Sequence, residues 1–196
     1  TVEGGQSLTF GGEYSLKEKK SGNDIIKAGL ATVLRDDEEM NLPTKSTLNN
    51  KGSDFIGSLV FEPNKNFKFD YNFSIDSDFE SSNYNSFKTD VSVNKFVTSF
   101  EFLQEDDEVG NESFLSNETS YNFNDSSSLK YRTRRNKKTD FTEFYNLIYE
   151  YKNDCLTASI QYNKDYYSDN ELKPTEELFF SISIVPLATL NTPSVR

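Results

Sequence analysis

Apolar and polar residues alternate with a period of two over most of the chain. Residues 67–75 show the pattern most clearly, because Phe, Tyr and Ile at odd positions alternate with Lys, Asp, Asn and Ser at even positions. The same alternation recurs in residues 87–94, 156–163 and 178–185. Successive side chains of a β-strand point to opposite faces, so each segment predicts a strand with one apolar and one polar face. No window shows a competing helical spacing, and we expect an all-β chain of about eleven strands.

The connections predicted between these strands alternate in length. Short turns fall at residues 20–23, 63–66, 94–95, 124–127 and 153–154, and longer polar loops at residues 36–53, 76–85, 104–112, 134–140 and 165–176. In an antiparallel up-and-down meander this order places every short turn at one end of the sheet and every long loop at the other.

This asymmetry is typical of a transmembrane β-barrel of a bacterial outer membrane, with short turns in the periplasm and long loops outside. Lipid cannot satisfy backbone N–H and C=O groups, so a spanning sheet must pair every strand and turn its apolar face outwards. We therefore expect residues 1–186 to be part of such a barrel and residues 187–196 to be a periplasmic tail. The alternative is a soluble secreted β-sandwich, in which the apolar faces share one core.

The amino-acid composition agrees with a sheet whose polar face contacts water. Only 34% of the residues are hydrophobic and mean hydropathy is -0.71, yet the chain has 17 Phe and 11 Tyr. In a barrel, aromatic side chains form girdles at the two membrane interfaces. The residues that we expect in such girdles are Phe67, Phe87, Tyr145, Tyr151, Tyr162, Tyr166 and Tyr167.

Charge and residue usage exclude several classes of function. The net charge of -11 argues against a nucleic-acid partner, because binding phosphates needs clustered Lys and Arg. The absence of His removes Ser-His-Asp triads, Cys-His pairs and His-ligated zinc. No phosphate-binding loop, dinucleotide fingerprint or CxxC pair is present. We expect no enzyme activity, no catalytic residue, no cofactor and no metal ligand set.

Residues 144–186 carry a resemblance to a known family. The run Glu150–Cys155 (EYKNDC) passes directly into Leu156–Ala158 (LTA), and the stretches Tyr166–Asp169, Leu172–Pro174 and Glu177–Pro186 follow. This region resembles the C-terminal end of the lipopolysaccharide (LPS) assembly protein LptD family. Upstream of about residue 140, only the barrel pattern matches.

The resemblance implies an outer-membrane barrel that inserts LPS into the outer leaflet. Its partners would be LPS, outer-membrane lipid, a plug lipoprotein and a periplasmic LPS bridge, the last contacted through an N-terminal domain upstream of residue 1. The chain lacks an initiator Met, and we expect it to be the C-terminal part of the barrel. The last predicted strand would then line the lateral seam through which lipid leaves. Its residues are Leu178, Phe180, Ile182, Ile184 and Pro186. Another porin-like barrel is the alternative.

Two further features have competing interpretations. Cys155 is the only cysteine, and the resemblance implies a disulfide to the N-terminal domain; the alternative is a free thiol. Lys130, Arg132 and Arg134 form a possible basic patch in the lumen for phosphorylated sugar. Ion pairs inside the lumen explain these basic residues equally well, with acids such as Asp70, Asp90, Glu101 and Glu150 as partners.

Acidic residues gather in two of the long loops, at residues 36–39 and 105–108. Carboxylates in external loops could hold the divalent cations that bridge LPS phosphates. Charge runs in loops are usually solvated, and solvation is the simpler interpretation of both clusters.

Overall fold

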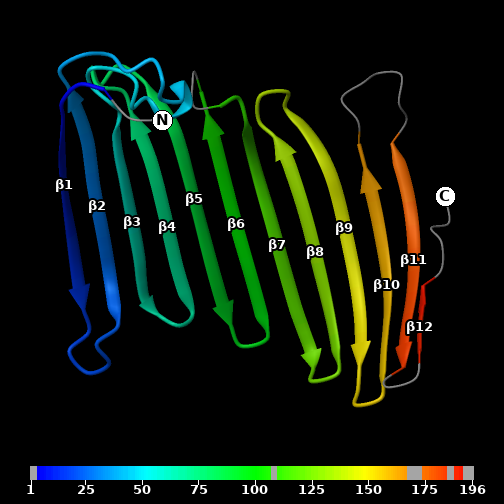
Figure 1. Cartoon of the computed structure of the whole chain (residues 1–196). Coiled ribbons are helices and arrows are strands. Elements are labelled where there is room, and N and C mark those ends of the chain that lie inside the picture. The colour runs from blue at the N-terminus through cyan, green and yellow to red at the C-terminus, as the bar shows by residue number, and fades with distance from the viewer. Residues whose placement is uncertain (1–3, 107–109, 167–173, 185–187, 192–196) are drawn as a thin grey trace. The chain divides into compact units, whose positions relative to one another are not determined.

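The chain folds as one antiparallel sheet whose strands follow each other in sequence order (Figure 1). The computed structural model describes residues 4–106, 110–166, 174–184 and 188–191. The strands are β1 (Ser7–Lys17), β2 (Asp24–Arg35), β3 (Phe55–Asn64), β4 (Phe67–Ile75), β5 (Ser82–Val93), β6 (Phe96–Glu105), β7 (Ser113–Asn124), β8 (Ser127–Asn136), β9 (Phe141–Lys152), β10 (Leu156–Asp165), β11 (Thr175–Ile184) and β12 (Ala188–Asn191). One 3-10 helix, η1 (Thr44–Ser46), lies between β2 and β3. The predicted all-β, up-and-down meander is confirmed.

Asparagine side chains shape the short turns. The oxygen of Asn64 accepts the N–H of Asn66 at 2.9 Å, and that of Asn124 accepts the N–H of Ser126 at 2.9 Å. Asn94 adopts a positive φ of 54° in the turn between β5 and β6. Asn favours such positions because its side chain bonds the backbone two residues on and it tolerates the left-handed conformation. Most of the connections at the opposite strand ends are longer, and the one between β2 and β3 is the longest of those described. The expected long loop at residues 134–140 is an exception, because β8 continues to Asn136 and leaves only residues 137–140. At the short-turn end, the connection between β1 and β2 takes up residues 18–23.

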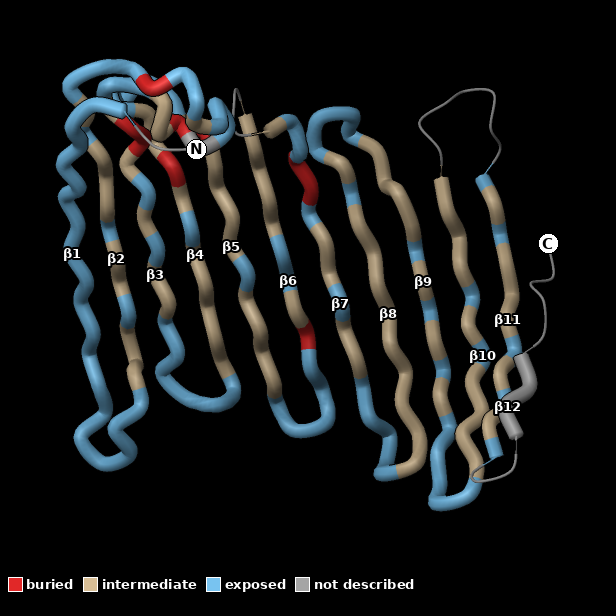
Figure 2. The backbone as a smooth tube through the Cα atoms, viewed as in Figure 1, coloured by how far each residue is buried: buried red, intermediate tan, exposed pale blue. Residues whose placement is uncertain are grey.

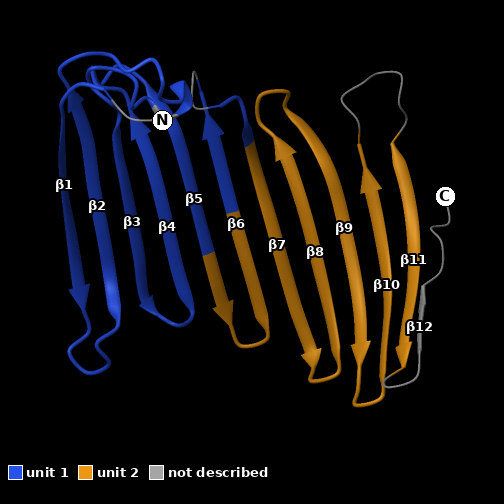
Figure 3. Ribbon diagram, viewed as in Figure 1, with its two compact units in different colours: residues 1–89, 101–113 blue, residues 90–100, 114–196 orange. Residues whose placement is uncertain are grey.

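Two compact units divide the chain (Figure 3). Unit 1 contains residues 1–89 and 101–113, and unit 2 contains residues 90–100 and 114–196. Within each unit, the strand register gathers most of the large apolar side chains on one face, hereafter the apolar face, and most of the charged ones on the other, the polar face. Ile56, Val60 and Ile148 are exceptions that lie on the polar face.

The register shows this in both units. In unit 1, Leu59 lies between Ala28 and Tyr71. In unit 2, Ile160 lies between Tyr149 and Phe180. The period-2 alternation therefore survives pairing, since residues opposite each other in an antiparallel ladder share a face.

In the described parts of the two units there is no conventional hydrophobic core (Figure 2). Among the described residues, Phe114 is the only buried hydrophobic side chain, at 8% exposure. A β-sandwich would bury the inner faces of both its sheets. Each unit is instead a single-layer sheet, because its apolar side chains are covered only by their neighbours on the same face.

A short strand lies within residues 187–196, the segment expected to be a periplasmic tail. Residues 188–191 form β12, which pairs with Ser181–Ile184 of β11. The segment does alternate apolar and polar residues, but four residues are too few to predict a strand from periodicity. Of the predicted tail, residues 187 and 192–196 lie outside the described residues.

Candidate functional site

The apolar face of unit 2 is exposed at the middle of its strands. Ile160 is 45% exposed, and its neighbours Tyr149 and Phe180 are 40% and 41% exposed. Large side chains at such positions are normally covered in a water-soluble domain. Other exposed members of this face are Tyr121, Phe123, Tyr145, Leu147, Tyr151, Tyr162, Ile182 and Ile184. Unit 2 thus presents a contiguous apolar surface, which is a feature of interaction sites.

The apolar face of unit 1 contains a row of stacked rings. The ring centroid of Phe87 lies 6.5 Å from that of Phe69 and 5.1 Å from that of Phe102. Phe87 was expected at a strand end, but it lies in the middle of β5. Nearby, the ring of Phe73 covers Gly57 so closely that a Cβ there would lie 2.2 Å from the ring. This contact explains the glycine inside a strand, since Gly often marks close approach.

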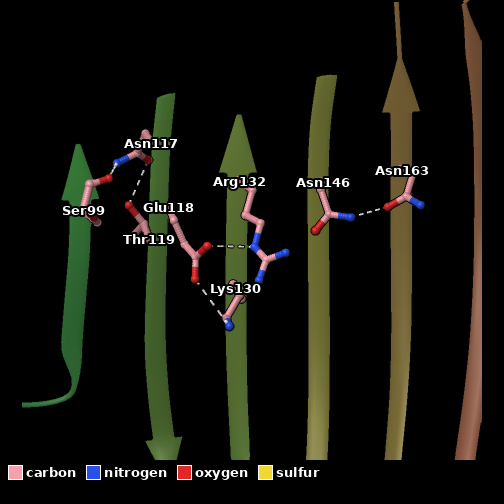
Figure 4. A network of polar contacts seen from close by, with 8 residues as sticks. All are labelled: Ser99, Asn117, Glu118, Thr119, Lys130, Arg132, Asn146 and Asn163. Carbon is pink, nitrogen blue, oxygen red and sulfur yellow. Dashed lines mark hydrogen bonds and ion pairs between the residues drawn. The ribbon is translucent and has the colours of Figure 1, made fainter. Parts of the chain in front are cut away.

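Lys130, Arg132 and Arg134 of β8 lie on the polar face and pair with acids on neighbouring strands. Figure 4 shows the two pairs made by Glu118. Glu118 of β7 lies 3.4 Å from the Lys130 ammonium and 2.9 Å from Arg132 Nε. Arg134 Nε lies 2.8 Å from Glu143 of β9. The ion-pair interpretation is therefore supported, with Glu118 and Glu143 as partners, two acids that were not among those named from the sequence. Because two cations share Glu118, this group keeps an excess of positive charge.

Arg134 also explains the burial of Phe114. Its guanidinium carbon lies 3.9 Å from the ring centroid of Phe114, an arrangement that favours a cation–π interaction. The register places Phe114 opposite Asn136, on the polar face. Phe114 thus lies on the polar face and is covered by the guanidinium of Arg134.

A polar cluster interrupts the apolar face of unit 2, and the sequence analysis did not single it out (Figure 4). The amide of Asn117 donates to Thr98 Oγ1 and to the carbonyl of Ser99, both at 3.0 Å. Thr119 Oγ1 lies 2.7 Å from Thr98 Oγ1 and donates to Asn117 Oδ1 at 3.0 Å. The cluster therefore satisfies its own hydrogen bonds. Elsewhere, on the polar face, Asn146 donates to Asn163 across β9 and β10.

A cavity of about 900 Å³ lies in unit 1, lined mainly by polar-face residues and by the β2–β3 loop. Small residues from β1, β2 and β3 contribute to its floor, among them Gly11, Gly29 and Ser58. Lys45 and Thr47 reach it from the loop. Its lining mixes hydroxyl, amide, charged and apolar groups, so no single ligand class follows from it.

The first acidic cluster has a structural role. Glu39 accepts the backbone N–H of Gly4 at 2.7 Å and that of Asn41 at 3.0 Å, and Asp36 accepts the N–H of Gln6 at 2.9 Å. Hydrogen bonds from Asn41 and Gly4 hold the pKa of Glu39 below its ordinary value, and the bond from Gln6 does the same for Asp36. These carboxylates fasten the β2–β3 loop to the segment before β1. Half of the second cluster, residues 107–108, lies outside the described residues.

The predicted disulfide and seam residues occupy two neighbouring regions of unit 2. Cys155 is exposed with a free thiol in the turn between β9 and β10, where Asn153 accepts its N–H at 3.0 Å. The predicted seam residues Leu178, Phe180, Ile182 and Ile184 share the apolar face of β11, as their spacing indicated. β11 is not an edge strand along its whole length, because β12 pairs with its end. Pro186 lies outside the described residues.

Other classes of site are missing from the described part of the chain. It contains no group of three or more Cys, Asp or Glu side chains arranged to hold a metal ion. Nor does it contain a helix with the length and apolar character to cross a membrane.

Comparison with known proteins gave no relative. No protein-family model matches the sequence, and no curated protein matches it.

Proposed function

We propose that this chain is a membrane-spanning sheet of an outer-membrane β-barrel, and that the barrel belongs to an LPS-assembly translocon. The observation that carries the proposal is the exposed apolar face described above, combined with the near absence of buried hydrophobic side chains among the residues that the structure describes. In water this surface would drive association. In a bilayer, acyl chains cover this apolar face and take the place of a protein core.

Strand length and connections support the barrel. β1 to β11 have nine to twelve residues each, which is the length that a tilted transmembrane strand needs. Turns shaped by Asn lie at one end and the longer polar loops at the other, the arrangement typical of periplasmic and external ends. The polar face, with Glu118, Arg132 and Asn146, would line a wet interior.

The assignment to LPS assembly rests on the resemblance of residues 144–186. Two features of the structure are compatible with it. The excess positive charge on β8 suits a phosphorylated saccharide, because guanidinium and ammonium groups bind phosphate oxygens. Cys155 is exposed at the short-turn end, where an oxidant or a partner thiol can reach it. In this proposal a plug lipoprotein occupies the interior and a periplasmic bridge delivers LPS.

A lysine footprint tests the choice of substrate. The full chain, folded in lipid vesicles, is acetylated with and without added LPS, and modification is read at each lysine by mass spectrometry. Lys130 and Lys68 form a matched pair, because both lie on the polar face beside a carboxylate and are 38% and 43% exposed. We expect LPS to protect Lys130 and not Lys68, and dephosphorylated LPS to protect neither. Equal modification of Lys130 with and without LPS would contradict the LPS assignment.

A further inference from the structure

The polar loop between β4 and β5, residues 76–81, displays an aromatic ring at a conformational cost. Phe79 is 66% exposed and has a positive φ of 62°. A positive φ is a genuine outlier for a bulky residue, because its Cβ crowds the neighbouring carbonyl. Such strain persists only where the surrounding structure imposes it.

Asp76 provides that surrounding structure. Its carboxylate accepts the backbone N–H of Glu80 at 2.8 Å, and the N–H and hydroxyl of Ser81 at 3.1 and 2.9 Å. Its main chain bonds Phe79 and Ser81, each at 3.1 Å. Desolvation of the carboxylate opposes these bonds, yet they lower the pKa of Asp76. The loop is thus closed around one carboxylate, and Phe79 is fixed at its tip.

The ring of Phe79 extends the apolar face of unit 1 at the long-loop end. It stacks on Phe55 with the ring centroids 4.7 Å apart. Phe55 is the first residue of β3 and lies opposite Ile75, which places it at the margin of the apolar face. Phe79 stays 66% exposed, so the contact with Phe55 leaves most of this residue uncovered.

We propose that residues 76–81 form an interfacial anchor that inserts Phe79 into the lipid–water boundary at the long-loop end. Aromatic side chains concentrate at this depth, where an apolar ring contacts acyl chains while the attached backbone stays hydrated. In this proposal, bilayer lipid contacts the exposed ring of Phe79. The anchor rests on the proposed function, because it requires the apolar face of unit 1 to contact lipid.

Tryptophan fluorescence tests the anchor directly, since the chain contains no Trp. Three single-Trp variants of the full chain are folded into phosphatidylcholine vesicles: Phe79→Trp, Phe180→Trp and Met40→Trp. Phe180 lies mid-strand on an apolar face, and Met40 is 88% exposed in the β2–β3 loop. Lipids brominated near the headgroup or at the chain end then report the depth of each Trp by quenching.

We expect the Trp at position 79 to emit at shorter wavelength than the Trp at position 40, and to be quenched best by bromine near the headgroup. The Trp at position 180 should be quenched better by bromine at the chain end, and the Trp at position 40 by neither. Solvent-like emission without quenching at position 79, together with quenching at position 180, overturns the anchor and leaves the proposed function intact. Absence of quenching at both positions overturns the proposed function as well.

A glycine substitution tests whether the ring of Phe79 stabilises the folded chain in a bilayer or is only tolerated there. Phe79→Gly removes the backbone strain, since Gly adopts positive φ at no steric cost. We expect this variant to unfold at a lower urea concentration than wild type in vesicles. A higher midpoint in vesicles would mean that the ring contributes nothing that outweighs its strain, and would contradict the anchor.

Discussion

A charge placed on the apolar face at two depths distinguishes a bilayer from water. Ile160 and Ile184 lie on the same face, are 45% and 42% exposed, and belong to adjacent strands. Ile160 is the fifth residue of the ten in β10, whereas Ile184 ends β11 opposite Leu156, directly beside a short turn. The two positions therefore differ mainly in their distance from the strand end.

Arginine at a lipid-facing position costs about 2–4 kcal/mol at the bilayer midplane and about 0–1 kcal/mol near the interface. We predict that Ile160→Arg lowers the free energy of unfolding in vesicles by roughly 2–4 kcal/mol, about 30- to 1,000-fold in the folding equilibrium. Ile184→Arg should cost about 1 kcal/mol or less. Gln161→Arg, next in sequence but on the polar face, is the control for the polar side and should cost a similarly small amount.

Urea titration of the vesicle-bound chain, followed by circular dichroism, measures all three values. Equal losses for Ile160→Arg and Ile184→Arg would refute the reasoning, because a depth-independent cost indicates a protein core or a dry interface in place of a bilayer. No loss for Ile160→Arg would refute it too, since a water-exposed face tolerates Arg.

Three further predictions concern local structure. Gly57→Val should lower the free energy of unfolding by about 1–3 kcal/mol, because the new side chain collides with the Phe73 ring. Gly12→Val is the control and should leave this free energy unchanged, because a Cβ there meets nothing within 4 Å. Similar urea midpoints for the two variants would contradict the close contact between Gly57 and Phe73. Because the folded-state pKa of Glu39 is lowered, its hydrogen bonds stabilise the β2–β3 loop above pH 4.5 and are lost as pH falls below it. Proteolysis of that loop should therefore accelerate on acidification in wild type, and a Glu39→Gln variant that keeps the same pH dependence would contradict this role. Asn153→Ala should lower the free energy of unfolding by about 1–2 kcal/mol, because two backbone N–H groups of the turn lose their acceptor. Asn153→Asp keeps the accepting oxygen and should be the more stable of the two variants. Equal unfolding midpoints for the two variants would contradict the role of Asn153 in the turn.

Strand positions and faces could be predicted because a strand needs only a period of two. The segments read as strands at 67–75 and 156–163 coincide with β4 and with most of β10, and the expected turn at Asn94 is present. These features depend on neighbouring residues in the chain alone, so one sequence contains the information they need.

Cross-strand partners could not be predicted in the same way. The carboxylate beside Lys130 and Arg132 is that of Glu118, which the sequence analysis did not name. Register decides such pairs, and the ladder between β7 and β8 shifts between Asn122 and Asn124. One residue of slip changes which side chains face each other, and alternation alone does not locate a bulge.

The strained residue Phe79 and the polar cluster on the apolar face of unit 2 could not be predicted from the sequence either. Phe79 lies in a long polar loop, where nothing in the local sequence distinguishes an aromatic residue at positive φ from one in ordinary backbone. The hydroxyl and amide groups of Thr98 and Asn117 satisfy each other between strands, so their compatibility with an apolar face depends on pairing. Both features arise from tertiary structure.

The central claim is that lipid covers the apolar face. Far-UV circular dichroism combined with protease protection of the full chain, in buffer and in phosphatidylcholine vesicles, tests it most directly. We predict stable, protected β-structure only in the vesicles, with cleavage confined to the long loops. Cooperative folding and equal protection in plain buffer would contradict the account, because the apolar faces would then be covered by protein in water.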